Sequence, residues 1–79
     1  MSTPILEVFG ANARRLRLKR KLTQERLAEL SSLHPNYIGG IERGERNLSL
    51  INIVRLIRAL QCRIGDLFDG ISTSEKPGR

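Results

Sequence analysis

The sequence predicts an all-α domain of five helices, and three observations lead to this prediction. Apolar residues recur at helical spacing along most of the chain. Residue types that cap helices, or that suit a first helical turn, stand where these runs begin. No stretch alternates apolar and polar residues as a half-buried strand would. The 79 residues suffice for one domain with a small core.

Each expected helix begins or ends at a recognisable signal. Thr3 and Thr23 have the hydroxyl group that caps a helix N-terminus, and Pro35 suits the first helical turn. Gly44 is expected to end the third helix in the left-handed conformation. The expected helices cover residues 5–20, 24–30, 35–43, 50–60 and 64–68. The expected core residues are Phe9, Ala13, Leu16, Leu27, Ala28, Leu30, Ile38, Ile41, Leu50, Ile53, Val54, Ile57 and Leu60.

Residues 69–79 are expected to form a flexible C-terminal tail. This segment consists mainly of Gly, Ser, Thr, Lys and Pro with a single isoleucine, and such a composition buries little apolar surface. The folded domain is therefore expected to cover residues 1–68.

The charge balance indicates a partner with negative charge. Fourteen Lys and Arg residues against eight Asp and Glu give a net charge of +6, with a pI near 10.8. This balance favours nucleic acid or an anionic membrane surface. All apolar runs are shorter than the ~18 residues of a membrane span. Cys62 is the only cysteine, so an internal disulfide is excluded, and we expect a cytoplasmic protein without a membrane segment.

Three runs of residues carry a resemblance to a known family. Residues 22–28 are Leu-Thr-Gln-Glu-Arg-Leu-Ala, residues 37–38 are Tyr-Ile, and residues 41–47 are Ile-Glu-Arg-Gly-Glu-Arg-Asn. Together they resemble the Cro/C1/Xre family of bacterial and phage regulators, and the similarity extends over residues 9–68. The segment from Tyr37 to Leu50 looks most like the controller proteins of restriction–modification systems. The resemblance implies a lambda-repressor-like helix-turn-helix fold.

The resemblance also implies that the third helix enters the major groove of DNA while the second crosses the phosphate backbone. Asn36 is the best candidate base reader, because its amide can bond N6 and N7 of adenine; a phosphate contact or a simple exposed polar residue are the alternatives. Pro35 stands where many members have a polar base reader. Gly39 and Gly40 are poor helix formers expected on the exposed face, where they would admit DNA closely. The candidate DNA-binding residues are Thr23, Gln24, His34, Asn36, Tyr37, Gly39, Gly40, Arg43, Arg46 and Asn47.

Four of the residues near this surface carry more specific expectations. Gln24 lies in the first turn of the second helix, where a phosphate binds favourably. Arg46 is the candidate that senses the width of the minor groove. The resemblance implies a partly buried ion pair between Arg17 and Glu42, so both are expected to be structural.

Two turn residues and two single side chains complete the site analysis. Lys21 and Ser32 stand where the family commonly has glycine, and a positive φ there would cost about 1 kcal/mol each. His34 is the only histidine, which excludes a metal site built on several imidazoles, and it is expected to cap the third helix or contact a phosphate. Cys62 is expected to be a buried structural thiol rather than a redox sensor. No cofactor and no metal are expected.

The C-terminal helices contain more apolar residues than one small core requires, so we expect a homodimer. A dimer would present the third helix twice, about one DNA turn apart, to a palindromic double-stranded operator. The alternative is that these residues cover the monomer core or the tail, and Leu67 and Phe68 are expected to pack at least partly inward. The candidate interface residues are Ile51, Ile64, Leu67, Phe68 and Ile71.

The expected function is that of a sequence-specific DNA-binding transcription regulator, a repressor or a controller protein. The main alternative is an antitoxin, in which the same domain binds DNA and a second surface holds a protein toxin. A basic first helix could also bind a membrane surface, but its apolar stripe is needed to cover the second and third helices. An enzyme is not expected, because the chain has no histidine pair, no phosphate-cradling glycine loop and no acid/base cluster.

Overall fold

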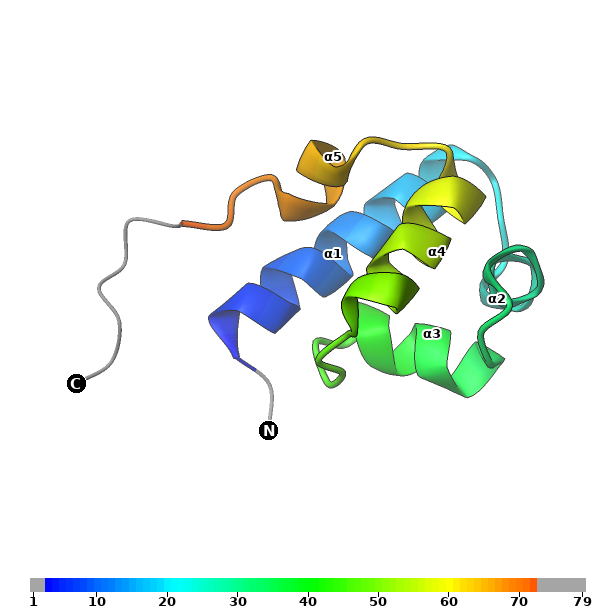
Figure 1. Ribbon diagram of the computed structural model, residues 1–79, viewed down its shortest axis with the longest axis horizontal. Helices are drawn as coiled ribbons and strands as arrows, with labels where there is room; N and C mark the ends of the chain where they lie inside the picture. The colour runs from blue at the N-terminus through cyan, green and yellow to red at the C-terminus, as the bar shows by residue number, and fades with distance from the viewer. Residues whose placement is uncertain (1–2, 73–79) are drawn as a thin grey trace.

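The computed structural model describes residues 3–72, and this part of the chain contains five α-helices and no strand. The predicted all-α class and number of helices are confirmed for these residues. In Figure 1, α2 is seen nearly end-on while α3 runs across the view, so a short turn joins two steeply crossed helices. The helices are α1 (Pro4–Lys19), α2 (Gln24–Ser31), α3 (Pro35–Glu42), α4 (Leu50–Leu60) and α5 (Ile64–Phe68).

All five helices contribute to one core. Helix α1 packs against α3 and α5, and α2 packs against α3 and α4. Gly10 allows α1 and α3 to approach closely, because a Cβ atom there would lie 2.1 Å from the carbonyl oxygen of Ile41. The buried apolar residues are Phe9, Ala13, Leu16, Leu27, Ala28, Ile38, Ile41, Leu56, Ala59, Leu60 and Leu67.

Side chains cap the N-termini of four helices. The hydroxyl oxygens of Thr3, Thr23 and Ser49 each accept a hydrogen bond from a backbone N–H three residues later, at 2.9 to 3.2 Å. His34 caps α3 through Nδ1, which accepts from the backbone N–H of Asn36 at 3.0 Å. These bonds satisfy donors that a helix leaves unpaired at its start, and they explain where the helices begin.

Left-handed residues end several of the helices. Lys21 and Ser32 both have a φ of 59°, at the two turns where the family commonly has glycine. Gln61, with a φ of 52°, ends α4 in the same way and was not predicted. Gly44 has a φ of 77° after α3, as the sequence predicts. Three side chains therefore occupy a conformation that glycine adopts at less cost.

Two of the predicted core residues are wrong. Leu30 is 44% exposed and Leu50 is 72% exposed. Helix α4 buries the predicted Leu60 together with Leu56 and Ala59, which were not predicted, while Ile53, Val54 and Ile57 are half-buried. The physical reason is that α4 is apolar on more than one side, so the spacing of its apolar residues does not determine which side meets the core.

The first residues of the predicted tail are tied to the folded unit. The amide nitrogen Nδ2 of Asn12 donates hydrogen bonds to the carbonyl oxygens of Leu67 and Asp69, both at 2.8 Å. Ile71 is half-buried against the core. Asn12 thus joins α1 to α5 and to the segment after it, whereas residues 73–79 of the predicted tail lie outside the described residues.

Candidate nucleic-acid interface

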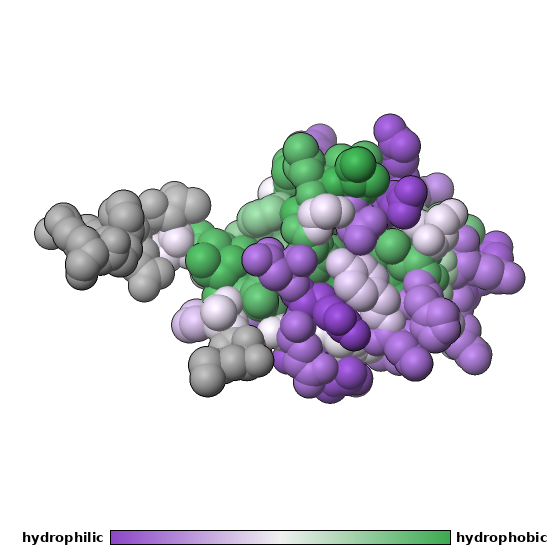
Figure 2. Space-filling model, turned by 60° about the horizontal axis from the view of Figure 1, so that its bottom comes forward, coloured by the Kyte–Doolittle hydropathy of each residue, from purple (hydrophilic) through white to green (hydrophobic). Residues whose placement is uncertain are grey.

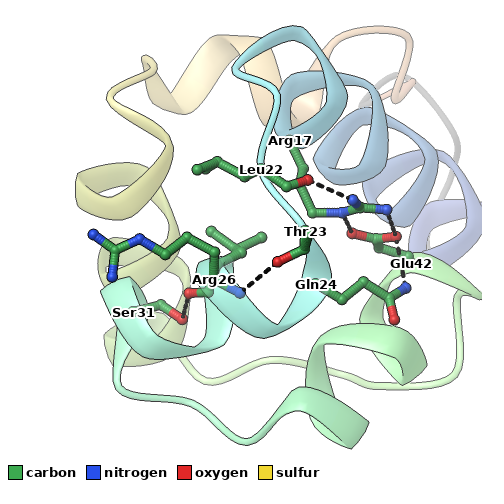
Figure 3. A network of polar contacts seen from close by, with 8 residues as sticks. Arg17, Leu22, Thr23, Gln24, Arg26, Ser31 and Glu42 are labelled. Carbon is green, nitrogen blue, oxygen red and sulfur yellow. Dashed lines mark hydrogen bonds and ion pairs between the residues drawn. The ribbon is translucent and has the colours of Figure 1, made fainter.

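A buried ion pair joins α1 to the end of α3, and its arginine also bonds the turn that leads into α2 (Figure 3). Arg17 of α1 donates from Nε to Oε2 of Glu42 at 2.7 Å and from Nη2 to Oε1 at 3.1 Å. Its Nη1 donates to the carbonyl oxygen of Leu22 at 2.7 Å. The two charged side chains are only 9% and 4% exposed. Arg17 and Glu42 therefore form the ion pair that the family resemblance implies. They hold α1, α3 and the α1–α2 turn in fixed positions.

Gln24 extends this network to the surface. Its Nε2 donates to Oε1 of Glu42 at 3.1 Å, and its side chain is exposed. A side-chain amide has two N–H bonds, so one donor and the carbonyl oxygen of Gln24 are still available to a ligand. Thr23 is exposed next to it, with its hydroxyl oxygen occupied as an acceptor by the α2 cap. Glu42 thus orients a polar side chain at the helix-turn-helix surface.

The start of α3 presents His34 and Asn36 to solvent. Both residues are exposed, and the imidazole of His34 accepts from the backbone N–H of Asn36. The bond to His34 uses only the backbone N–H of Asn36, so the side-chain amide of Asn36 takes no part in the cap. The structure therefore displays Asn36 at the point where the sequence analysis expects a base reader.

Tyr37 is half-buried and connects α3 to α4. Its hydroxyl oxygen accepts a hydrogen bond from Nδ2 of Asn52 at 3.3 Å. The guanidinium carbon of Arg46 lies 5.5 Å from the centre of the Tyr37 ring. Such a cation–π contact holds a charged side chain in place with little loss of exposure. Asn52 was missed by the sequence analysis, and no local pattern could have revealed a partner fifteen residues away.

Gly39 and Gly40 are buried, which corrects the expectation that they are exposed. Arginine side chains from beyond the helix cover them. A Cβ atom on Gly39 would lie 3.0 Å from Nη1 of Arg43, and one on Gly40 would lie 3.0 Å from Cγ and Nε of Arg46. The spacing of four residues from Gly39 to Arg43, one helical turn, was a signal for this contact that the sequence analysis did not use.

The loop after α3 is rich in charge. Arg43, Arg46 and Asn47 are all exposed. Nε of Arg43 donates to Oε2 of Glu45 at 3.1 Å, and this hydrogen bond is the main reason why the pKa of the exposed Glu45 carboxyl is lowered. In Figure 2, which turns the α3 side forward, hydrophilic residues cover the lower and right parts of the face. Two of the exposed side chains of this loop, Arg43 and Arg46, are cationic.

The candidate dimer residues divide into surface and core. Ile51 and Ile64 are 66% and 55% exposed, and Phe68 is also exposed, with its ring edge against Phe9 at 5.4 Å between ring centres. Ile71 is half-buried. Leu67 is completely buried in the core, so its assignment to a dimer interface is wrong. Leu67 points inward because α5 has only five residues, and Leu67 is the one that attaches this short helix to the core.

Other kinds of site find little support in the described part of the chain. No group of three or more His, Cys, Asp and Glu side chains among residues 3–72 is placed to hold a metal ion. None of the helices there combines the length and apolar character that crossing a membrane requires. Cys62 is half-buried, and burial, with a smaller contribution from the charge of Asp66, raises the pKa of its thiol. A raised pKa makes the thiol less reactive.

The steeply crossed α2 and α3, the buried ion pair and the exposed basic loop define a helix-turn-helix domain of the kind found in DNA-binding regulators. A family described as helix-turn-helix matches residues 14–67 of the chain.

The relatives narrow this class further. Control protein C.BamHI of Bacillus amyloliquefaciens is 44% identical over 70 residues, covering 87% of this chain and 86% of that protein. Control protein C.SmaI of Serratia marcescens is 43% identical over 63 residues, covering 80% and 75%. The crystal structure of the restriction–modification controller protein C.AhdI from Aeromonas hydrophila superimposes with a TM-score of 0.77 at 49% identity, covering 80% of this chain and 96% of that one.

The chain belongs to the restriction–modification controller proteins, a family of helix-turn-helix transcription regulators. The predicted resemblance is confirmed. The relatives are regulators rather than enzymes, and they favour the regulator over the antitoxin alternative.

Proposed function

We propose that the chain regulates transcription of the genes of a restriction–modification system by binding a palindromic DNA operator as a homodimer. The observation that carries the proposal is the set of exposed amide and guanidinium side chains that α2, α3 and the following loop present together. Amides suit base edges, and guanidinium groups suit phosphates and guanine. The set consists of Gln24, Asn36, Arg43, Arg46 and Asn47.

Within this proposal α3 lies in the major groove and α2 crosses the backbone. Asn36 bonds an adenine edge, because its side-chain amide is exposed at the start of α3. Gln24 and the backbone N–H groups at the start of α2 bind a phosphate, since the donors and the helix dipole both favour an anion there. Thr23, His34 and Tyr37 act mainly by holding these helices, through the caps and the bond to Asn52.

A dimer follows from the limits of one short helix. Proline and two glycines occupy much of α3, so each monomer reads few bases, and a second copy doubles the contacts. The surface for this pairing is supplied by Ile51, Ile64 and Phe68, with Leu50 added because it is exposed on the same α4 turn as Ile51. Several large apolar side chains exposed on so small a chain favour a self-complementary interface.

The test combines oligomeric state with DNA binding. Wild type and Ile64→Asp are compared by sedimentation at tens of micromolar and by titration of duplexes that carry one or both halves of the footprint upstream of the chain's own gene. We expect a wild-type dimer that prefers the full palindrome and whose log–log salt slope is about −0.9 for each of ~6–10 phosphate contacts. Ile64→Asp should be a folded monomer without that preference.

Leu18→Asp is the matched control, because Leu18 is a similarly exposed apolar residue on α1 that belongs to no proposed interface. It should sediment as the wild type does. Two folded monomers with unchanged affinity for the full palindrome would contradict the dimer, and a salt slope near zero would contradict DNA binding through this basic surface.

A further inference from the structure

The recognition helix contains two adjacent glycines, Gly39 and Gly40, called here the glycine pair. Each glycine in a helix interior costs about 1 kcal/mol of stability relative to alanine, so two adjacent glycines need an explanation. Simple exposure to solvent does not explain them, because both are buried. The side-chain atoms nearest to them come from Arg43 and Arg46, outside α3, with Oε1 of Gln24 farther from Gly39.

The glycines leave too little room for a Cβ atom under either arginine in its present position. A Cβ atom at Gly39 would lie 3.0 Å from Nη1 of Arg43, which is the tip of that side chain. A Cβ atom at Gly40 would lie 3.0 Å from both Cγ and Nε of Arg46. Both distances are shorter than ordinary van der Waals contact, so an added Cβ atom would displace the arginine by a few tenths of an ångström.

Each arginine is held from a second side as well. Arg46 lies over the ring of Tyr37, and that tyrosine is fixed to α4 by Asn52. Arg43 is hydrogen-bonded to Glu45. A guanidinium group that is already ordered loses less conformational freedom when it binds. The arginines are thus preorganised along a helix that has few polar side chains of its own.

We propose that Gly39 and Gly40 are positioning residues that let Arg43 and Arg46 lie on α3, where the two guanidinium groups supply the DNA contacts that the helix lacks. This inference rests on the proposed function. The ligand is an acceptor group of DNA, either the O6 and N7 edge of a guanine or a phosphate oxygen. The glycine pair therefore acts on DNA through the arginines, and not by admitting the backbone of DNA directly.

A double-mutant cycle separates these two roles. The four proteins are wild type, Gly40→Ala, Arg46→Ala and the double variant, titrated with the footprinted operator duplex. Gly40→Ala should weaken binding about tenfold in the wild-type background, the scale of one lost guanidinium contact. It should have less than about a twofold effect when Arg46 is already alanine, because the positioned group is gone. The cycle of Gly39→Ala with Arg43→Ala should give the same pattern of operator affinities. In the cross cycle of Gly40→Ala with Arg43→Ala, the two losses of binding free energy should be additive.

Thermal stability separates a positioning role from a purely structural one. If Gly40 served only the fold, its replacement would lower Tm. Alanine is the better helix former, so Gly40→Ala should raise Tm by about 4–8 °C while binding weakens. In the Gly40→Ala variant without DNA, the NMR signal of the Arg46 Nε–H group should lose the ring-current shift that Tyr37, the only tyrosine, causes in the wild type. If the salt slope falls by about 0.9 with each arginine removed, the acceptor is a phosphate; an unchanged slope with altered base preference identifies guanine.

Two results would overturn the inference. One is an equal loss of affinity from Gly40→Ala with and without Arg46, which would mean that DNA itself needs the small residue. The other is a lost ring-current shift with unchanged affinity. A wild-type protein that binds no operator, with the ring-current shift intact, would instead refute the proposed function.

Discussion

The two ends of this small domain are stabilised by different kinds of contact. One end, formed by α2, α3 and the Arg17 end of α1, is proposed to face DNA and is called here the DNA-facing end. It contains a buried ion pair with extra hydrogen bonds to Leu22 and Gln24. The C-terminal end, formed by α4 and α5, has no buried charge among its described residues and leaves large apolar side chains such as Leu50 and Ile64 in solvent.

The difference matches what each end has to do. Hydrogen-bonded ions are directional, and a buried pair tolerates no alternative partner, so the DNA-facing end is held in one geometry. Apolar contact is not directional and scales with area, so the C-terminal end can accept a second copy by covering surface. Within the proposed function, rigid placement and association fall to separate parts of the 79 residues.

The strongest test of this comparison removes the buried cation. Arg17→Ala should lower the free energy of unfolding by roughly 3–5 kcal/mol, because the nearly inaccessible carboxylate of Glu42 would be left without its partner. That loss is enough to unfold a domain of this size. Urea unfolding at one fixed protein concentration measures it, since the proposed dimer would make the midpoint depend on concentration.

Arg26→Ala is the matched control. Arg26 also forms an ion pair at 2.7 Å, with Glu29, but the two side chains are 56% and 70% exposed. Its removal should cost less than about 1 kcal/mol, because water replaces an exposed partner. Similar losses in the two variants would contradict the claim that burial makes the Arg17 pair decisive.

Features encoded by neighbouring residues were the ones that the sequence could predict. The bounds of α4 and α5 and the caps at Thr3 and Thr23 follow from local residue types, and the structure has them. The α2 to α3 turn was also local, with Ser32 as the left-handed residue. The pairing of Arg17 with Glu42 came from family resemblance, since twenty-five residues separate them.

Contacts between distant residues could not be predicted in this way. The side of α4 that faces the core depends on where α2 lies, and α4 is apolar on more than one side. The bonds of Asn12 to Leu67 and Asp69 cross more than fifty residues. The cover of Gly40 by Arg46 depends on how the chain turns back after Gly44. Each requires the assembled fold rather than a pattern along the chain.

A smaller effect is expected where the two ends are joined. Asn12→Ala should cost about 1–3 kcal/mol, because it leaves two carbonyl oxygens at the end of α5 without their donor. Amide hydrogen exchange should rise in α5 more than in α2 and α3, since the lost bonds attach only the C-terminal end. Asn52→Ala is the control: it removes one part-buried bond to Tyr37 and should leave exchange in α5 unchanged. A uniform rise across all helices would show that the two ends unfold as one unit.

The smallest effect tests whether the two ends are strained alike. Ser32 ends α2 and Gln61 ends α4, and both hold a side chain in the left-handed conformation. Glycine removes the contact between Cβ and the following carbonyl, worth about 1–2 kcal/mol, but it also has more backbone freedom to lose on folding, so the net gain should be about 0.5–1 kcal/mol in each variant. Urea midpoints of Ser32→Gly, Gln61→Gly and the double variant measure the gain, which should be additive if the turns are independent. Equal gains would mean that the strain belongs to the turn geometry alone. A loss of stability in Ser32→Gly beside a gain in Gln61→Gly would show that the DNA-facing end relies on its serine side chain, and the two turns would then differ as the two ends of the domain do.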